Sequence, residues 1–182
     1  MDPFALLGLP RRPLLSEDQI GTAYRKLAGA LHPDQPGGDE SRFKELGEAV
    51  ATLRDPARRL RALMDVPTEN SLPSQAADLF PQVASILHHS AELIEKHSVA
   101  SQPLSKALLV TPLKAVALEL STTLAQVRVW KDSLTQEVEE LDRHWPECET
   151  AGVPLLANSF AFAARWEAEL RERELALMLI LS

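Results

Sequence analysis

The sequence has little cysteine, few aromatic residues and no excess of positive charge. Cys148 is the only cysteine among 182 residues, which excludes an intramolecular disulfide and an all-cysteine metal or cluster site held by this chain alone. Aromatic residues make up 5% of the chain, so its core has to be largely aliphatic. The net charge of −7 argues against general binding to nucleic acid or to anionic membranes, because affinity for phosphates requires clustered lysine and arginine.

Targeting signals and membrane-spanning segments are not expected either. The chain begins with Met1 and Asp2 and lacks the basic region that precedes the apolar part of a signal peptide. The apolar run from Leu175 to Leu181 is far shorter than the roughly 20 residues that a membrane helix needs. We therefore expect a cytoplasmic protein with neither nucleic acid nor membrane as a partner.

The negative charge is unevenly distributed along the chain. Residues 1–65 contain ten basic and ten acidic residues, whereas residues 66–182 contain nine basic and sixteen acidic residues. The segment 66–74 is rich in proline and hydroxyl side chains, which is typical of a linker. We therefore predict a first module over 1–65 and a second module over 78–182, joined by a linker over 66–77.

Nearly every element is expected to be helical, because apolar residues recur at intervals of three and four and never alternate over the length of a strand. Capping residues and prolines mark most of the helix starts. The predicted helices cover about residues 3–7, 16–32, 39–54, 56–64, 78–97, 112–145 and 156–180. Residues 98–111 form either a loop or the first turns of the sixth helix. The predicted fold class is all-α, with four helices followed by an antiparallel three-helix bundle or coiled-coil-like domain.

The most regular periodicity in the chain begins at Pro112. Apolar residues alternate there at spacings of four and three, which favours a long helix packed against antiparallel neighbours. We call this set the inner seam; it consists of Leu113, Ala117, Leu120, Leu124, Val127, Lys131, Leu134, Val138, Leu141 and Trp145. Lys131 is its one polar member.

His32, Pro33 and Asp34 lie in the predicted loop between the second and third helices. Pro33 restricts its own backbone and that of the preceding residue to extended geometry, which would hold His32 and Asp34 in place before a partner binds. The Asp34 carboxylate can accept a charge-assisted hydrogen bond. Arg25 and Lys26 form a basic helix face that suits an acidic surface. A simple helix stop, and a solvated helix face, are the alternative interpretations.

This arrangement resembles the J-domain over residues 2–64. The resemblance rests on Phe-Ala-Leu-Leu-Gly-Leu at 4–9, Tyr-Arg-Lys-Leu-Ala at 24–28, the His-Pro-Asp loop, and Leu-Arg-Asp-Pro at 53–56 followed by two arginines. It implies a domain that binds a DnaK-type chaperone in its ATP state, accelerates ATP hydrolysis and delivers a client.

On this resemblance, the chaperone-binding residues are His32, Pro33, Asp34, Arg25 and Lys26. The resemblance implies no catalytic residue, metal or cofactor, so the chain is not expected to be an enzyme. Gln35 stands where the family usually has a lysine, which weakens the positive patch. We predict that the C-terminal helices recruit a protein client or scaffold.

Two alternatives stay open for the whole chain. A J-domain followed by three helices in a short acidic chain also looks like the HscB-type co-chaperone, which presents an iron–sulfur scaffold protein to a specialised DnaK relative. The other alternative is a coiled-coil interaction protein with a degenerate J-domain. That protein would dimerise through inner-seam residues such as Leu120, Leu124 and Leu134.

Overall fold

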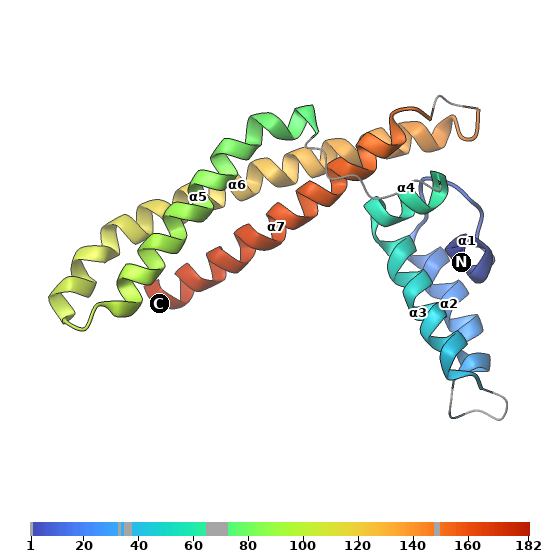
Figure 1. Cartoon of the computed structure of the whole chain (residues 1–182), viewed down its shortest axis with the longest axis horizontal. Coiled ribbons are helices and arrows are strands. Elements are labelled where there is room, and N and C mark those ends of the chain that lie inside the picture. Colours follow the sequence, from blue (N-terminus) through green and yellow to red (C-terminus); the bar gives the residue numbers. More distant parts are fainter. Residues whose placement is uncertain (1, 33, 35–37, 65–72, 148–149) are drawn as a thin grey trace. The chain divides into compact units, whose positions relative to one another are not determined.

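The computed structural model describes residues 2–32, 34, 38–64, 73–147 and 150–182. Its helices are α1 (Pro3–Leu7), α2 (Glu17–Leu31), α3 (Glu40–Arg54), α4 (Pro56–Met64), α5 (Ser74–Val99), α6 (Pro103–Arg143) and α7 (Val153–Leu181) (Figure 1). The described residues contain no strand, which confirms the predicted all-α fold class. Pro33, Gln35, Cys148 and much of the predicted linker lie outside the described residues.

The chain divides into two compact units, each assembled from stretches that are distant in sequence. Unit 1 comprises Met1–Ser71 and Leu134–Phe160, and unit 2 comprises Leu72–Ser133 and Ala161–Ser182. The helices α6 and α7 therefore each continue from one unit into the other. The division predicted from the sequence, with one module ending at residue 65 and the next beginning at residue 78, stays a prediction.

Side-chain caps begin the first three helices. The Asp2 carboxylate accepts a hydrogen bond from an amide of α1 at 3.0 Å, and the Asp39 carboxylate accepts one from an amide of α3 at 3.1 Å. Ser16 and Gln19 complete a reciprocal capping box at the start of α2, with distances of 2.9 and 3.2 Å. Gly8 ends α1 with a φ of 62°, which glycine adopts without steric cost. These local bonds confirm the predicted helix starts, because they satisfy amides without intrahelical partners.

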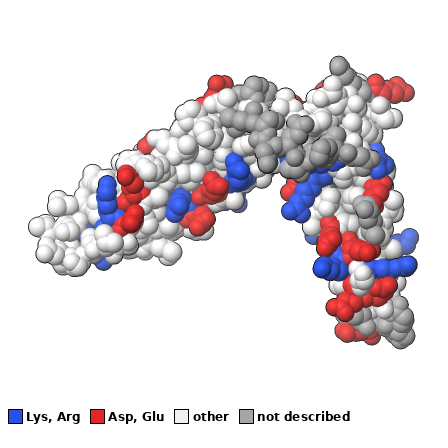
Figure 2. Space-filling model, in the orientation of Figure 1, with Lys and Arg blue, Asp and Glu red and all other residues white. Residues whose placement is uncertain are grey.

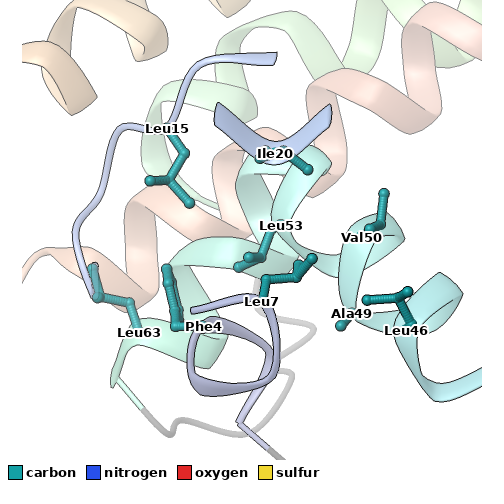
Figure 3. Close-up of a cluster of buried hydrophobic side chains, with 9 residues drawn as sticks. All are labelled: Phe4, Leu7, Leu15, Ile20, Leu46, Ala49, Val50, Leu53 and Leu63. Atoms are coloured by element: carbon teal, nitrogen blue, oxygen red, sulfur yellow. The ribbon is translucent and has the colours of Figure 1, made fainter. Parts of the chain in front are cut away.

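The core of unit 1 is largely aliphatic and includes side chains from all four of its N-terminal helices. It consists of Phe4, Leu7, Leu15, Ile20, Leu46, Ala49, Val50, Leu53 and Leu63 (Figure 3). Trp145, which follows α6, packs against the same cluster. The stretch after Leu134 therefore contributes side-chain packing to the N-terminal helices.

Hydrogen bonds also join the loop after α1 to the end of α6 within unit 1. The Arg12 guanidinium binds the Asp142 carboxylate with two nitrogens, one of them at 2.9 Å from Oδ1. The Leu14 amide donates to the same oxygen at 3.0 Å, and the Trp145 indole donates to the Arg11 carbonyl at 2.8 Å. No local pattern predicts these bonds, because their partners are about 130 positions apart in the chain.

In unit 2, α5, α6 and α7 pack against one another as a bundle. The Gln82 amide of α5 donates to the Thr123 hydroxyl of α6 at 3.3 Å. The Trp166 ring of α7 lies 5.8 Å from the Trp130 ring of α6 and 6.3 Å from the Phe80 ring of α5, measured between centroids. These contacts confirm the predicted packing of three C-terminal helices.

The inner seam is buried inside the chain. Leu113, Leu120, Leu124, Val127, Leu134 and Val138 are all 2% exposed or less. Lys131 lies half-buried and donates to the Glu167 carboxylate at 2.8 Å, which explains how a charged residue occupies the seam. The dimer expected for the coiled-coil alternative is therefore not possible through this surface in the folded chain.

The start of α6 decides between the two alternatives for residues 98–111 in favour of helix from Pro103 onward. The helix begins at Pro103 and continues through Pro112, which the sequence pattern places at the first helical position. An interior proline removes one helical hydrogen bond and costs about 3 kcal/mol. Burial of Leu113 and Val116 directly after Pro112 offsets this cost, because each adds roughly 1.5–3 kcal/mol. The helices α5 and α7 also begin about a turn earlier than predicted.

Candidate functional site

The predicted site lies where α2 ends and the chain turns back toward α3. His32 caps α2, and its backbone amide donates to the Ala28 carbonyl at 3.0 Å. The Asp39 amide donates to the Leu31 carbonyl at 3.2 Å and closes the base of the loop. Two ordered helix ends therefore hold the part of the site that contains His32.

His32 organises the backbone beside it. The Asp34 amide donates to the His32 Nδ1 atom at 3.2 Å, and the Asp34 carboxylate lies 3.5 Å from the same nitrogen. The ring also packs edge-on against Phe43, with centroids 5.3 Å apart. The side chain of Asp34 is 85% exposed and points its charge to solvent, where a partner can reach it.

Arg25 and Lys26 lie on the exposed surface of α2 that leads to this loop. Arg25 precedes His32 by seven residues and therefore lies on the same side of the helix. Its guanidinium donates to the Thr22 hydroxyl at 3.1 Å, one turn earlier. Lys26 lines a surface hollow of about 490 Å³ between α1 and α2. Arg25 thus lies on the side of α2 that leads to His32, whereas Lys26 lies about 100° further round the helix, beside that hollow.

Gly29 lies one turn before the loop on the same helix surface. A Cβ atom built on Gly29 would meet nothing within 4 Å, so the packing of this chain does not require glycine there. Glycine in a helix interior costs about 1 kcal/mol relative to alanine. Glycine therefore leaves the backbone of α2 accessible at this position. It also lowers the stability of the helix, and no packing contact of this chain explains that loss.

The basic surface is local and does not extend over the whole of unit 1. Acidic and basic side chains lie next to each other over α2 and α3 in the view of Figure 2. Across the two helices, the Arg54 guanidinium binds Glu17 at 3.0 Å on an exposed surface. A partner is therefore expected to recognise the geometry of the α2 surface and the loop more than the total charge.

Arg59 holds the junction of α3 and α4, at the end of α3 away from the His32 loop, and a single sequence does not reveal this role. Its side chain is 6% exposed and donates to the Pro13 and Leu53 carbonyls, both at 2.7 Å. Burial lowers the pKa of Arg59 although nearby carboxylates oppose the shift. The adjacent Arg58 is exposed, and nothing in the local pattern distinguishes the two arginines.

The comparisons with known proteins point to the same segment. Residues 2–62 match the family model of the DnaJ domain. The chaperone protein DnaJ of Deinococcus proteolyticus is 49% identical over 61 residues, which are 32% of this chain and 19% of that protein. The chaperone protein DnaJ of Hyphomonas neptunium is 48% identical over 61 residues, covering 32% and 15%. The protein SIS1 of Saccharomyces cerevisiae is 43% identical over 56 residues, covering 31% and 15%.

These matches confirm the predicted resemblance for the N-terminal segment. The chain spans less than a fifth of the length of these relatives, and the matched family segment ends within α4. No solved structure matches the chain. The HscB-like layout and the roles of the five predicted site residues stay predictions.

Proposed function

We propose that this chain, which carries a DnaJ domain at residues 2–62, is a co-chaperone that binds a DnaK-type chaperone and stimulates its ATPase. The observation that carries the proposal is the position of Asp34. Its exposed carboxylate follows the end of α2 and lies 3.5 Å from the Nδ1 atom of His32.

The residues of this site would act by binding and not by covalent chemistry. Asp34 would accept a charge-assisted hydrogen bond from an arginine of the chaperone, a contact worth about 1.5–3 kcal/mol. His32 would hold the Asp34 amide and so reduce the entropy lost on binding. Arg25 and Lys26 would meet an acidic surface and orient the two proteins during their encounter. Members of J-domain co-chaperone families are generally not enzymes themselves.

The C-terminal helices would recruit a protein client or scaffold. Unit 2 contains a hollow of about 430 Å³ between α6 and α7, lined by Ala117, Leu177, Met178 and Leu181. Leucine and methionine side chains adapt to apolar segments of varied shape. Met178→Lys is therefore expected to weaken capture of an unfolded client with little effect on ATPase stimulation; unchanged capture would contradict this role.

The decisive experiment measures the steady-state ATPase of a DnaK-type chaperone with the full chain. The wild-type protein should stimulate hydrolysis, and Asp34→Asn should lower the stimulation at least tenfold, because the exposed charge is lost and the fold is not. Glu48→Gln on α3 is the matched control, since it also removes an exposed carboxylate. Stimulation that survives Asp34→Asn would contradict the proposed contact. A wild-type chain that stimulates no DnaK-type chaperone would instead support the degenerate J-domain.

A further inference from the structure

The helix α6 carries a second periodic surface, on the side opposite the inner seam. We call it the outer stripe; it consists of Leu104, Leu108, Thr111, Ala115, Leu118, Thr122, Ala125 and Val129. Its members alternate at spacings of four and three, all are exposed, and none is charged. The four largest are 69–72% exposed.

The outer stripe is long, and it is not part of the core of unit 2. At 1.5 Å per residue it extends for about 39 Å along α6. Because each residue rotates the helix by about 100°, the stripe lies across the helix from the buried Leu120, Leu124 and Val127. The other helices of the bundle pack on that buried side. The stripe therefore has no partner among the described residues.

We propose that the outer stripe pairs with the same stripe of a second copy of this chain, as an antiparallel helix pair about a two-fold axis. In a two-fold interface, residue i contacts residue j and residue j contacts residue i. The alternating spacing reads the same in both directions, so an antiparallel copy matches it layer by layer. The layers are Leu104 with Val129, Leu108 with Ala125, Thr111 with Thr122, and Ala115 with Leu118.

The layers also match in size. In the layers of Leu108 and Leu118 a leucine faces an alanine, which lets the two helices approach closely without empty space between them. The two threonine positions meet each other, so their hydroxyl groups can pair. A parallel arrangement would place each leucine against the same leucine and each alanine against the same alanine, which leaves an uneven gap.

The exposed area of the stripe suits a dimer. The four largest members alone, at 69–72% exposed, present roughly 500 Å², and the four smaller exposed members add to this toward the about 800 Å² that each partner buries in a standard interface. Exposed apolar patches on a typical monomer rarely exceed about 300–600 Å². Pairing would therefore cover an apolar surface that is large for a protein of 182 residues.

A membrane is the other surface that such a helix could meet. An 18-residue window of α6 reaches a mean hydropathy of 1.4 with 28% of it buried, so by length and composition this helix could cross a membrane. The outer stripe, however, contains neither tryptophan nor phenylalanine, the aromatic residues typical of the apolar face of an interfacial helix. The stripe has two residues in every seven, and this narrow spacing is typical of the contact surface between two paired helices. We therefore favour the second copy.

The first test measures the mass of the full chain by light scattering at increasing protein concentration. The wild-type protein should approach twice the 20.1 kDa mass of one chain. Leu118→Glu should weaken the dimer at least tenfold, because it places charges next to the two-fold axis. Leu179→Glu on α7 is the matched control, since Leu179 is also apolar and exposed but lies outside the stripe. Circular dichroism checks that both variants stay helical.

The second test identifies the orientation by disulfide cross-linking in a Cys148→Ser background. A mixture of Thr111→Cys and Thr122→Cys chains should form a cross-linked dimer. Thr111→Cys alone should not, because antiparallel pairing separates the two copies of residue 111 by about 16 Å along the axis. Cross-linking of Thr111→Cys alone would overturn the antiparallel arrangement.

Two other results would overturn the self-pairing. One is a monomeric mass at every concentration. The other is a wild-type monomer that sediments with vesicles of neutral or anionic lipid and loses this binding in Leu118→Glu, which would assign the stripe to a membrane. Neither result depends on DnaK ATPase stimulation, so the proposed co-chaperone function is tested separately.

Discussion

The two units hold their helices together by different means. Unit 1 joins short helices with side-chain caps and with arginines that bind backbone carbonyls far away in the chain. Unit 2 joins long helices through an apolar seam and a cluster of charges around one carboxylate. Both units bury apolar side chains, but the short helices of unit 1 add polar bonds to backbone groups, whereas the long helices of unit 2 repeat side-chain contacts along their length.

The charged cluster of unit 2 is centred on Glu167. Its side chain is 11% exposed and binds Lys131 at 2.8 Å, Arg171 at 2.9 Å and Arg128 at 3.3 Å. The hydrogen bond from Lys131, supported by the two arginines, lowers the pKa of Glu167 against the opposing effect of burial. The cluster therefore links α6 and α7 through a charge that the fold keeps ionised.

The largest effect on the free energy of unfolding is expected at Arg59, whose buried hydrogen bonds join backbone segments of unit 1. Arg59→Met keeps most of the side-chain volume but leaves the Pro13 and Leu53 carbonyls without their donors. Unsatisfied buried groups cost about 1–3 kcal/mol each, so the loss of two donors should lower the free energy of unfolding by about 2–6 kcal/mol. Urea denaturation measures the change. Arg58→Met is the control, since that residue is exposed and should change the value by less than about 0.5 kcal/mol.

Trp145 tests whether the stretch after Leu134 stabilises the N-terminal helices. Trp145→Phe keeps an aromatic ring against the core of unit 1 but removes the donor to the Arg11 carbonyl. The free energy of unfolding should fall by about 1 kcal/mol, the net value of one hydrogen bond. Hydrogen exchange should show faster opening in α1 and in the loop after it. Unchanged protection there would show that this bond does not stabilise the N-terminal helices.

Acid should weaken unit 2 through Glu167. The pKa of this carboxyl is lower in the folded chain than its ordinary value of 4.5, so its stabilising effect is complete above about pH 4.5. The effect is lost as the pH falls through the lowered pKa. Thermal unfolding of the wild type and of Glu167→Gln should therefore differ at pH 7 and converge toward pH 3. A gap between the two that stays constant with pH would contradict this role.

The smallest expected effect on stability is at Gly29. One substitution there separates what the residue contributes to stability from what it contributes to ATPase stimulation. Gly29→Ala should raise the free energy of unfolding by up to about 1 kcal/mol, because no neighbour obstructs the added methyl group. If the chaperone approaches the backbone of α2 there, the same change should lower ATPase stimulation. Thermal unfolding and the ATPase assay measure the two effects on one variant. Equal stimulation by both proteins would place the contact away from Gly29.

Local signals predicted much of this protein. The caps at Asp2 and Ser16 and the glycine stop at Gly8 act within a few residues, so they predict helix ends without knowledge of the fold. The sequence left residues 98–111 open between a loop and the first turns of the sixth helix, because the burial of Leu113 that compensates for Pro112 depends on other helices. For the same reason the sequence did not distinguish the buried Arg59 from its exposed neighbour.

The amino-acid sequence by itself determined the helical class, the order of the helices, and a segment with the motif of a DnaJ domain, since all three depend on residues close together in the chain. The sequence also marked the inner seam of α6 as a packing surface, but only the tertiary structure decided that it packs within the chain while the outer stripe stays exposed. Both the inner seam and the outer stripe repeat at spacings of four and three. Periodicity identifies the side of a helix that is apolar, but its neighbours in space determine whether that side lies in the core or in solvent.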